Sequence, residues 1–165
     1  MDKSVLVLGV PHQLQGPHFE NHVDDPSYRV LAESLIRNVD FVFEEAAGQG
    51  PSIAENLVNS IRGLDHYLDV DPSGDDRPKY GIGTIAQQNA YIDPKNSEDM
   101  YSRLLIDEQT KREELWQSKI NNQEFRKALM ICGIGHGLSF AFRLIDAGFI
   151  DVECYSYIPF EKIPK

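Results

Sequence analysis

Two uninterrupted apolar runs constrain most strongly what this chain can fold into. Residues 5–8 (VLVL) lie near the start of the 165 residues, and residues 128–132 (ALMIC) lie near their end. Neither run alternates apolar with polar residues, as a strand with one face in water would. Each therefore predicts a strand that is covered on both faces, which is typical of a parallel sheet between two layers of helices.

Strand and helix patterns alternate along the rest of the chain. The strands are expected at residues 4–8, 39–43, 66–70, 127–132 and 150–155, and the helices at 26–38, 51–61, 97–120 and 137–147. Asp25 before Pro26 is typical of a helix start. We therefore predict an α/β fold: one three-layer domain over residues 1–165, whose mostly parallel central sheet is flanked by helices.

Charge and hydropathy exclude some classes of partner. The formal net charge is −10, which disfavours binding to the phosphate backbone of nucleic acid. No run approaches the roughly 20 apolar residues that span a bilayer, and the apolar start is too short for a signal peptide. The two cysteines lack a CxxC spacing and are expected to be buried thiols. We expect a cytoplasmic protein with no nucleic-acid or membrane partner.

The same four-residue signature follows both apolar runs. Its two copies are Gly9-Val10-Pro11-His12 and Gly133-Ile134-Gly135-His136. Histidine binds metals and transfers protons near neutral pH, so a strand, a glycine turn and a histidine, written twice, indicate two imidazoles at one edge of a sheet. Gly9 and Gly133 would let the chain turn off each strand, and Gly135 would let a ligand approach the backbone at a helix N-terminus.

Other titratable residues follow the predicted strands. Glu44 and Glu45 come after the second strand and Asp71 after the third. Because ligands bind at the carboxyl ends of parallel strands, these residues are expected to share one rim with the histidines. Two imidazoles and a carboxylate suit Mn, Zn or Fe, and we predict His12, Glu44 and His136 as ligands of a divalent metal. A carboxylate that does not bind the metal, Glu44 or Glu45, could be the general base.

Each of these residues also has a plain structural interpretation. Either histidine alone could be a loop residue that makes hydrogen bonds, and Glu44-Glu45 could be a solvated turn. Asp71 before Pro72 is typical of a turn. Arg112 could pair with Glu108 four residues earlier in a helix, and Trp116 is expected in the core.

Four short motifs together resemble the EreA/ChaN-like superfamily, which includes the TraB and Tiki proteins and the erythromycin esterases. They are residues 9–12, 133–136, 41–45 (FVFEE) and 111–116 (KREELW). The resemblance implies an α/β fold with histidines and glutamates in one active site. It implies metal-dependent hydrolysis, ester hydrolysis or the handling of haem and iron. It also implies that Arg112 stabilises an anion or oxyanion. The chain departs from the pattern because it is short and has no recognisable signal peptide or membrane anchor.

Two functional hypotheses follow. The first is a metal-dependent hydrolase of ester or peptide bonds, with Glu44, Glu45 and Arg112 as catalytic residues and a small molecule or peptide as substrate. The second is a non-catalytic module that binds haem, an iron species or a phosphorylated metabolite at the glycine turn, with Gly9, Gly133, Gly135 and Asp71 as ligand-binding residues. The apolar tail at 155–160 could pack on its own domain or in a homo-oligomer, and the sequence leaves that choice open.

Overall fold

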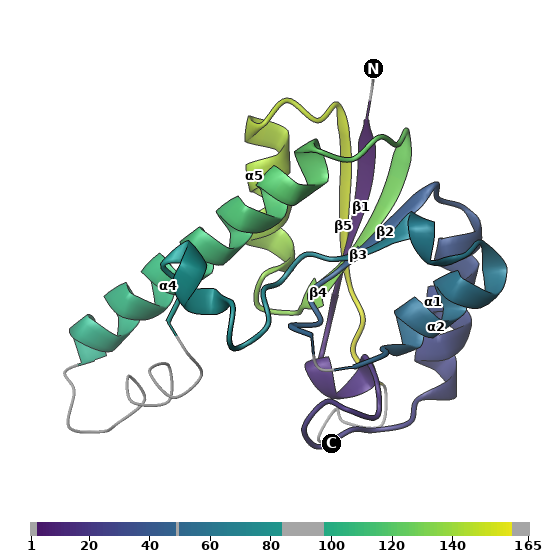
Figure 1. Ribbon diagram of the computed structural model, residues 1–165, viewed down its shortest axis with the longest axis horizontal. Helices are drawn as coiled ribbons and strands as arrows, with labels where there is room; N and C mark the ends of the chain where they lie inside the picture. The colour runs from purple at the N-terminus through teal and green to yellow at the C-terminus, as the bar shows by residue number, and fades with distance from the viewer. Residues whose placement is uncertain (1–2, 49, 84–97, 160–165) are drawn as a thin grey trace.

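The computed structural model describes residues 3–48, 50–83 and 98–159, without the side chains of 98–103. In this part of the chain, five strands form one parallel sheet in the order β3-β2-β4-β1-β5 (Figure 1). The strands are β1 (Ser4–Val10), β2 (Phe41–Glu44), β3 (Tyr67–Asp69), β4 (Lys127–Gly133) and β5 (Asp151–Ser156). The α/β fold predicted from the sequence is confirmed, and every strand begins and ends within two residues of its predicted bounds.

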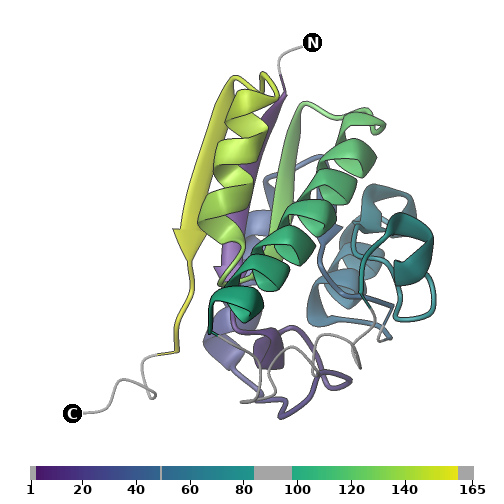
Figure 2. The ribbon, with the colours of Figure 1, turned by 90° about the vertical axis from the view of Figure 1, so that its left-hand side faces the viewer.

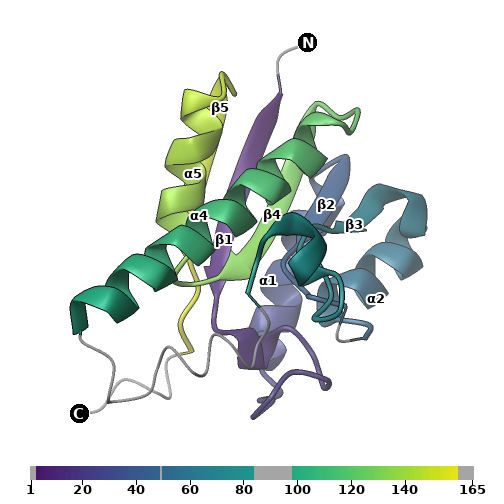
Figure 3. The ribbon, with the colours of Figure 1, turned by 60° about the vertical axis from the view of Figure 1, so that its left-hand side comes forward.

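Helices cover both faces of the sheet and complete the three layers. They are α1 (Pro26–Arg37), α2 (Ile53–Ile61), α4 (Glu98–Asn121) and α5 (Gly137–Asp146). The long α4 and α5 lie in front of the strands in Figure 2, whereas α1 and α2 lie behind the sheet in Figure 3. None of the helices described here is both long enough and apolar enough to cross a membrane.

Each face of the sheet has its own apolar core. Trp116 of α4 and Phe140 of α5 pack with Val7 and Met130 on one face. Tyr28 and Ile36 of α1 pack with strand residues such as Leu129 on the other face. The central strands are therefore buried on both sides, which explains why residues 5–8 and 128–132 are apolar without alternation.

Capping side chains fix where α1 and α2 begin. Asp25 accepts hydrogen bonds from the backbone N–H groups of Ser27 and Tyr28, as its place before Pro26 predicts. Helix α2 begins at Ile53 rather than at the predicted position 51, because the Ser52 side chain is the N-cap and accepts from the N–H of Glu55. Its hydroxyl thereby becomes part of the network described below.

The connections place a switch point between β1 and β4. The chain leaves β1 through α1 toward β2, and leaves β4 through α5 toward β5, on the other side of the sheet. Adjacent strands whose connections run in opposite directions open a crevice at their carboxyl ends, where ligands bind in open α/β sheets. His12 and His136 follow these two strands.

Candidate active site

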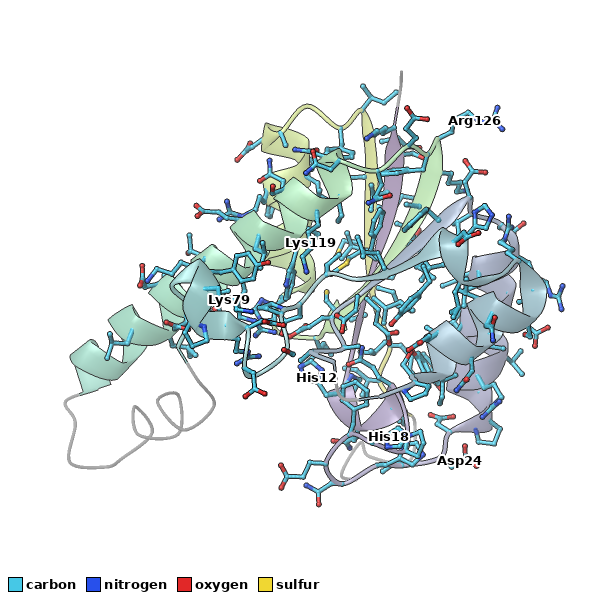
Figure 4. All side chains as sticks on the ribbon, viewed as in Figure 1. His12, His18, Asp24, Lys79, Lys119 and Arg126 are labelled. Carbon is cyan, nitrogen blue, oxygen red and sulfur yellow. The ribbon has the colours of Figure 1, made fainter. Side chains whose placement is uncertain are left out.

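His12 is the exposed side chain of the site. It begins a 3-10 turn, His12–Leu14, after β1, and half of its side-chain surface (50%) is accessible to solvent. Its Nδ1 lies 2.7 Å from Gln15 Oε1, and its Nε2 lies 3.7 Å from Glu45 Oε1. Figure 4 shows His12 at the carboxyl end of the strands, opposite Arg126 near the start of β4.

Glu45 lies at the centre of the cluster and is almost completely buried. Its Oε2 accepts a hydrogen bond of 2.7 Å from the N–H of Gly133, at the end of β4. Its Oε1 accepts from Arg112 Nη2 in a close ion pair and lies 3.9 Å from His136 Nε2. Glu45 thus connects the turns that follow β1, β2 and β4.

His136 is the buried imidazole, and it is held by helix α4. Its Nδ1 lies 3.0 Å from Glu113 Oε1, which also accepts a hydrogen bond of 2.7 Å from the Ser139 hydroxyl. Burial raises the pKa of Glu113, but the hydrogen bonds from His136 and Ser139 outweigh it, so that this pKa is lowered. The ring of Trp116 meets that of His136 edge-on at 4.9 Å.

Arg112 joins the cluster to the end of β3. Its Nε donates to Asp71 Oδ1 at 2.9 Å, and its Nη1 lies 3.3 Å from His136 Nε2. The same Asp71 oxygen accepts the indole N–H of Trp116, and Arg77 donates to the other oxygen. Burial raises the pKa of Asp71, but the charges of Arg112 and Arg77 together have a larger effect, and the pKa lies below its ordinary value. Asp71 therefore serves as an ionised partner of two arginines.

The alternative prediction, that Arg112 pairs with Glu108 in the same helix, is wrong. Glu108 accepts a hydrogen bond of 2.7 Å from the N–H of Gly83. The ion-pair partners of Arg112 are Glu45 and Asp71, which are distant in sequence and adjacent in the sheet.

Glu44 and Glu45 have different surroundings although they are neighbours in sequence. Successive residues at the end of a strand point to opposite faces of the sheet. Glu44 accordingly faces the α2 side, where Gln15, Ser52 and Tyr67 all donate to its carboxylate. The sequence pattern predicts Glu44 as the carboxylate beside the two imidazoles, whereas in the structure that carboxylate is Glu45.

The buried Glu44 carboxyl makes stability depend on pH. Burial outweighs its three donors and raises its pKa from 4.5 to about 7. Between these two values the folded state keeps a proton that the unfolded state loses, so this group lowers the free energy of unfolding as pH rises through that window. The full effect is about 3 kcal/mol.

We expect Glu44→Gln to remove that part of the pH dependence. Urea unfolding of the wild type and the variant at pH 4.5, 5.5 and 7.5 measures it. The stability of the wild type should fall relative to that of the variant as pH rises. Glu33→Gln, which changes an exposed glutamate of α1, is the control. Parallel pH profiles for wild type and Glu44→Gln would contradict the assignment.

The predicted ligand-binding glycines have distinct surroundings. A Cβ on Gly133 would lie 2.5 Å from His12 Nε2, so the imidazole occupies the space that this glycine leaves open. A Cβ on Gly9 would meet the backbone of Ile134 at 3.3 Å, which indicates a packing role in the turn. A Cβ on Gly135 would meet nothing within 4 Å.

Several residues of the site carry no clear local signal in the sequence. Gln15 lies in a polar stretch of the sequence, yet it is completely buried. Glu113 belongs to the 111–116 motif, but its partner His136 is 23 residues away, so local spacing does not reveal its role. Arg77, which follows β3, also belongs to the site, where it donates to Asp71.

Comparison of the chain with known proteins identifies no relative. No family model, curated protein or solved structure matches the chain. The resemblance to the EreA/ChaN-like superfamily thus stays a prediction.

The donor set of the site bears on the predicted metal. In the described parts of the chain, no three His, Cys, Asp or Glu side chains form a group that could hold a metal ion. The reason is visible around His136, whose Nε2 faces the permanently charged Arg112 guanidinium, itself paired with Glu45. In this arrangement Arg112 already supplies the positive charge, and the residues do not fit a metal ion. Whether the protein binds a divalent metal or haem in solution stays an untested prediction.

Proposed function

We propose that this protein is a hydrolase of carboxylic esters in which His12 is the general base and no metal takes part. The observation that supports this most directly is the half-exposed His12 side chain, whose Nε2 lies 3.7 Å from the buried Glu45 that pairs with Arg112. Positioned side chains of this kind typically accelerate proton-transfer reactions by 10²–10⁴-fold. Among the described residues, His12 interacts with Gln15, Glu45 and Phe19, none of which is a nucleophile for this reaction, and we therefore take water as the nucleophile.

The proposed reaction has two steps. Water loses a proton to His12 Nε2 while its oxygen attacks the ester carbonyl carbon, and the carbonyl electrons move onto oxygen. The tetrahedral intermediate then collapses, and the departing alkoxide takes the proton from the His12 imidazolium. Glu45, 3.7 Å from Nε2, stabilises the imidazolium between these steps. Arg112 is the cation that we assign to the developing oxyanion.

The proposal agrees with the esterase branch of the resemblance stated above. The two Gly-x-x-His motifs, the FVFEE strand end and the KREELW helix each contribute a residue to one cluster, namely His12, His136, Glu45 and Arg112. Convergence from four distant segments is stronger support than any one of these motifs.

A panel of chromogenic esters tests the function. The purified chain is incubated with p-nitrophenyl esters of short and medium acyl length, with EDTA and, separately, with added Mn²⁺ or Zn²⁺. We expect hydrolysis that EDTA does not reduce. Activity that appears only with added metal would support the metal-dependent version instead. Lack of hydrolysis, together with a Soret shift on haem titration or thermal stabilisation by phosphorylated metabolites, would favour the binding module.

Two glycine variants provide a matched test of the site. We expect Gly133→Ala to lower kcat/KM by on the order of 10²-fold, because the new Cβ displaces the half-exposed His12 ring from its place beside Glu45. Gly135→Ala, two residues away in the same turn, should leave kcat/KM within about twofold. Urea unfolding of both variants checks that the fold is kept. Equal activities of the two variants would contradict this placement of His12.

A further inference from the structure

We propose that Gln15 is a positioning residue that fixes the proton of the neutral His12 imidazole on Nδ1, so that Nε2 keeps the lone pair that accepts a proton from water. The catalytic role of Gln15 rests on the proposed function. The structural part of the proposal, the identity of the protonated nitrogen, can be tested without any substrate.

The acceptors around Gln15 fix the orientation of its side-chain amide. Its Nε2 lies 3.0 Å from Glu44 Oε1 and 3.1 Å from the backbone carbonyl oxygen of Glu45. The carbonyl oxygen can only accept, whatever the protonation state of Glu44. The reverse orientation of the amide would place its oxygen against this acceptor, so the amide nitrogen must face Glu44 and Glu45 and the amide oxygen must face His12.

The tautomer of His12 follows from that orientation. Gln15 Oε1 lies 2.7 Å from His12 Nδ1, and an amide oxygen cannot donate a hydrogen bond. A proton on Nδ1 makes this contact a good hydrogen bond, whereas a proton on Nε2 would leave two lone pairs facing each other. The competing acceptor for an Nε2 proton is Glu45 Oε1, which at 3.7 Å lies beyond hydrogen-bond distance.

Gln15 itself is held firmly. Its side chain is completely buried, its N–H donates to the carbonyl of His12, and its own carbonyl accepts from the N–H of Ile53. Behind it, the hydroxyls of Ser52 and Tyr67 donate to Glu44. A buried amide is costly unless its hydrogen bonds are made, and here both ends of the amide are bonded. The network therefore runs from α2 and β3 through Glu44 and Gln15 to the exposed imidazole.

The surroundings of His136 fix its tautomer in a similar way. His136 Nδ1 faces Glu113 Oε1 at 3.0 Å, so it also carries its proton on Nδ1, through a carboxylate rather than an amide. Its Nε2 faces the Arg112 guanidinium, which can only donate. Nε2 of His12 and Nε2 of His136 lie 3.7 Å and 3.9 Å from Glu45 Oε1, but the His12 side chain is half exposed whereas that of His136 is buried.

Nitrogen NMR of the full chain tests the proposal. The protein is labelled with ¹⁵N-histidine and studied by long-range ¹H–¹⁵N spectroscopy at a pH where His12 is neutral, and the His12 signals are assigned by their loss in His12→Ala. We expect the pattern of the Nδ1–H tautomer for His12. A wild-type His12 that carries its proton on Nε2 would overturn the proposal, and this result needs no variant to fold.

A variant pair separates positioning from general structure. In Gln15→Met we expect the Nε2–H tautomer of His12 to become populated, since only Glu45 then competes for the proton, while the His136 signals stay unchanged. The kcat/KM for the best ester should fall about tenfold. This loss is smaller than the loss expected when the base itself is removed, which is on the order of 10²–10⁴-fold. Gln13→Met, in the same turn, should change neither quantity. A Gln15→Met protein that keeps the Nδ1–H pattern would overturn the proposal, and a chain with the expected tautomers but no hydrolysis would refute only the proposed function.

Discussion

Replacing His12 with alanine is expected to lower kcat/KM for ester hydrolysis by a factor on the order of 10²–10⁴. The variant removes the proposed base, a half-exposed imidazole whose Nε2 lies 3.7 Å from Glu45 Oε1. It should fold, because His12 is half exposed and the Gln15 oxygen that it leaves can be reached by water. Steady-state kinetics measure the loss, and urea unfolding checks the fold.

His66→Ala is the matched control for that experiment. His66 is also exposed, and its Nδ1 contacts the carbonyl of Asp40 at the opposite end of the sheet. This variant should keep kcat/KM within about twofold of the wild type. If His12→Ala hydrolysed esters as fast as His66→Ala, His12 would not be the base.

Replacing Arg112 with methionine is expected to have the largest effect on stability, a loss of about 3–5 kcal/mol. The variant removes the guanidinium that pairs with Glu45 and Asp71, and both carboxylates are buried. Removing one partner of a buried pair costs more than the pair contributes, because the remaining charge stays without its partner. Arg77 and Trp116 still donate to Asp71, so most of the loss is expected to fall on Glu45.

Urea unfolding measures this loss, and Arg37→Met is its control. Arg37 pairs with Glu33 four residues earlier on the exposed surface of α1, where such pairs contribute about 0.3–0.5 kcal/mol. Arg112→Met should therefore shift the unfolding midpoint far more than Arg37→Met. Similar midpoints would show that the buried pairs of Arg112 do not stabilise the fold.

Much of the fold could be predicted from the sequence because parallel strands leave a strong local signal. The runs at 5–8 and 128–132 are apolar on both faces, and glycine and proline mark their ends. The rim could also be predicted, since the carboxyl ends of parallel strands meet at one edge whatever the order of the strands. The turns after β1, β2, β3 and β4 do supply His12, Glu45, Asp71 and His136 to one cluster.

What could not be predicted depends on contacts between distant segments. The choice between Glu44 and Glu45 requires the orientation of a strand end, which two consecutive glutamates do not reveal. Local spacing favoured Glu108 as the partner of Arg112, but the β2–β4 pairing brought Glu45 into reach. Gln15 is an unremarkable residue in a polar stretch, and only the closed network around it shows why it is buried.

The pairing of β1 with β4 has a consequence for how the cluster comes into being. Val5 pairs with Ala128, so this contact closes a loop of roughly 120 residues. Contacts of such long sequence separation form late in folding. A nascent chain that carries only β1 to α4 already contains His12, Glu45 and Arg112, but it lacks the strand that holds them together. Hydrolytic activity should therefore arise in one step, when β4 and His136 have been synthesised and added to the sheet.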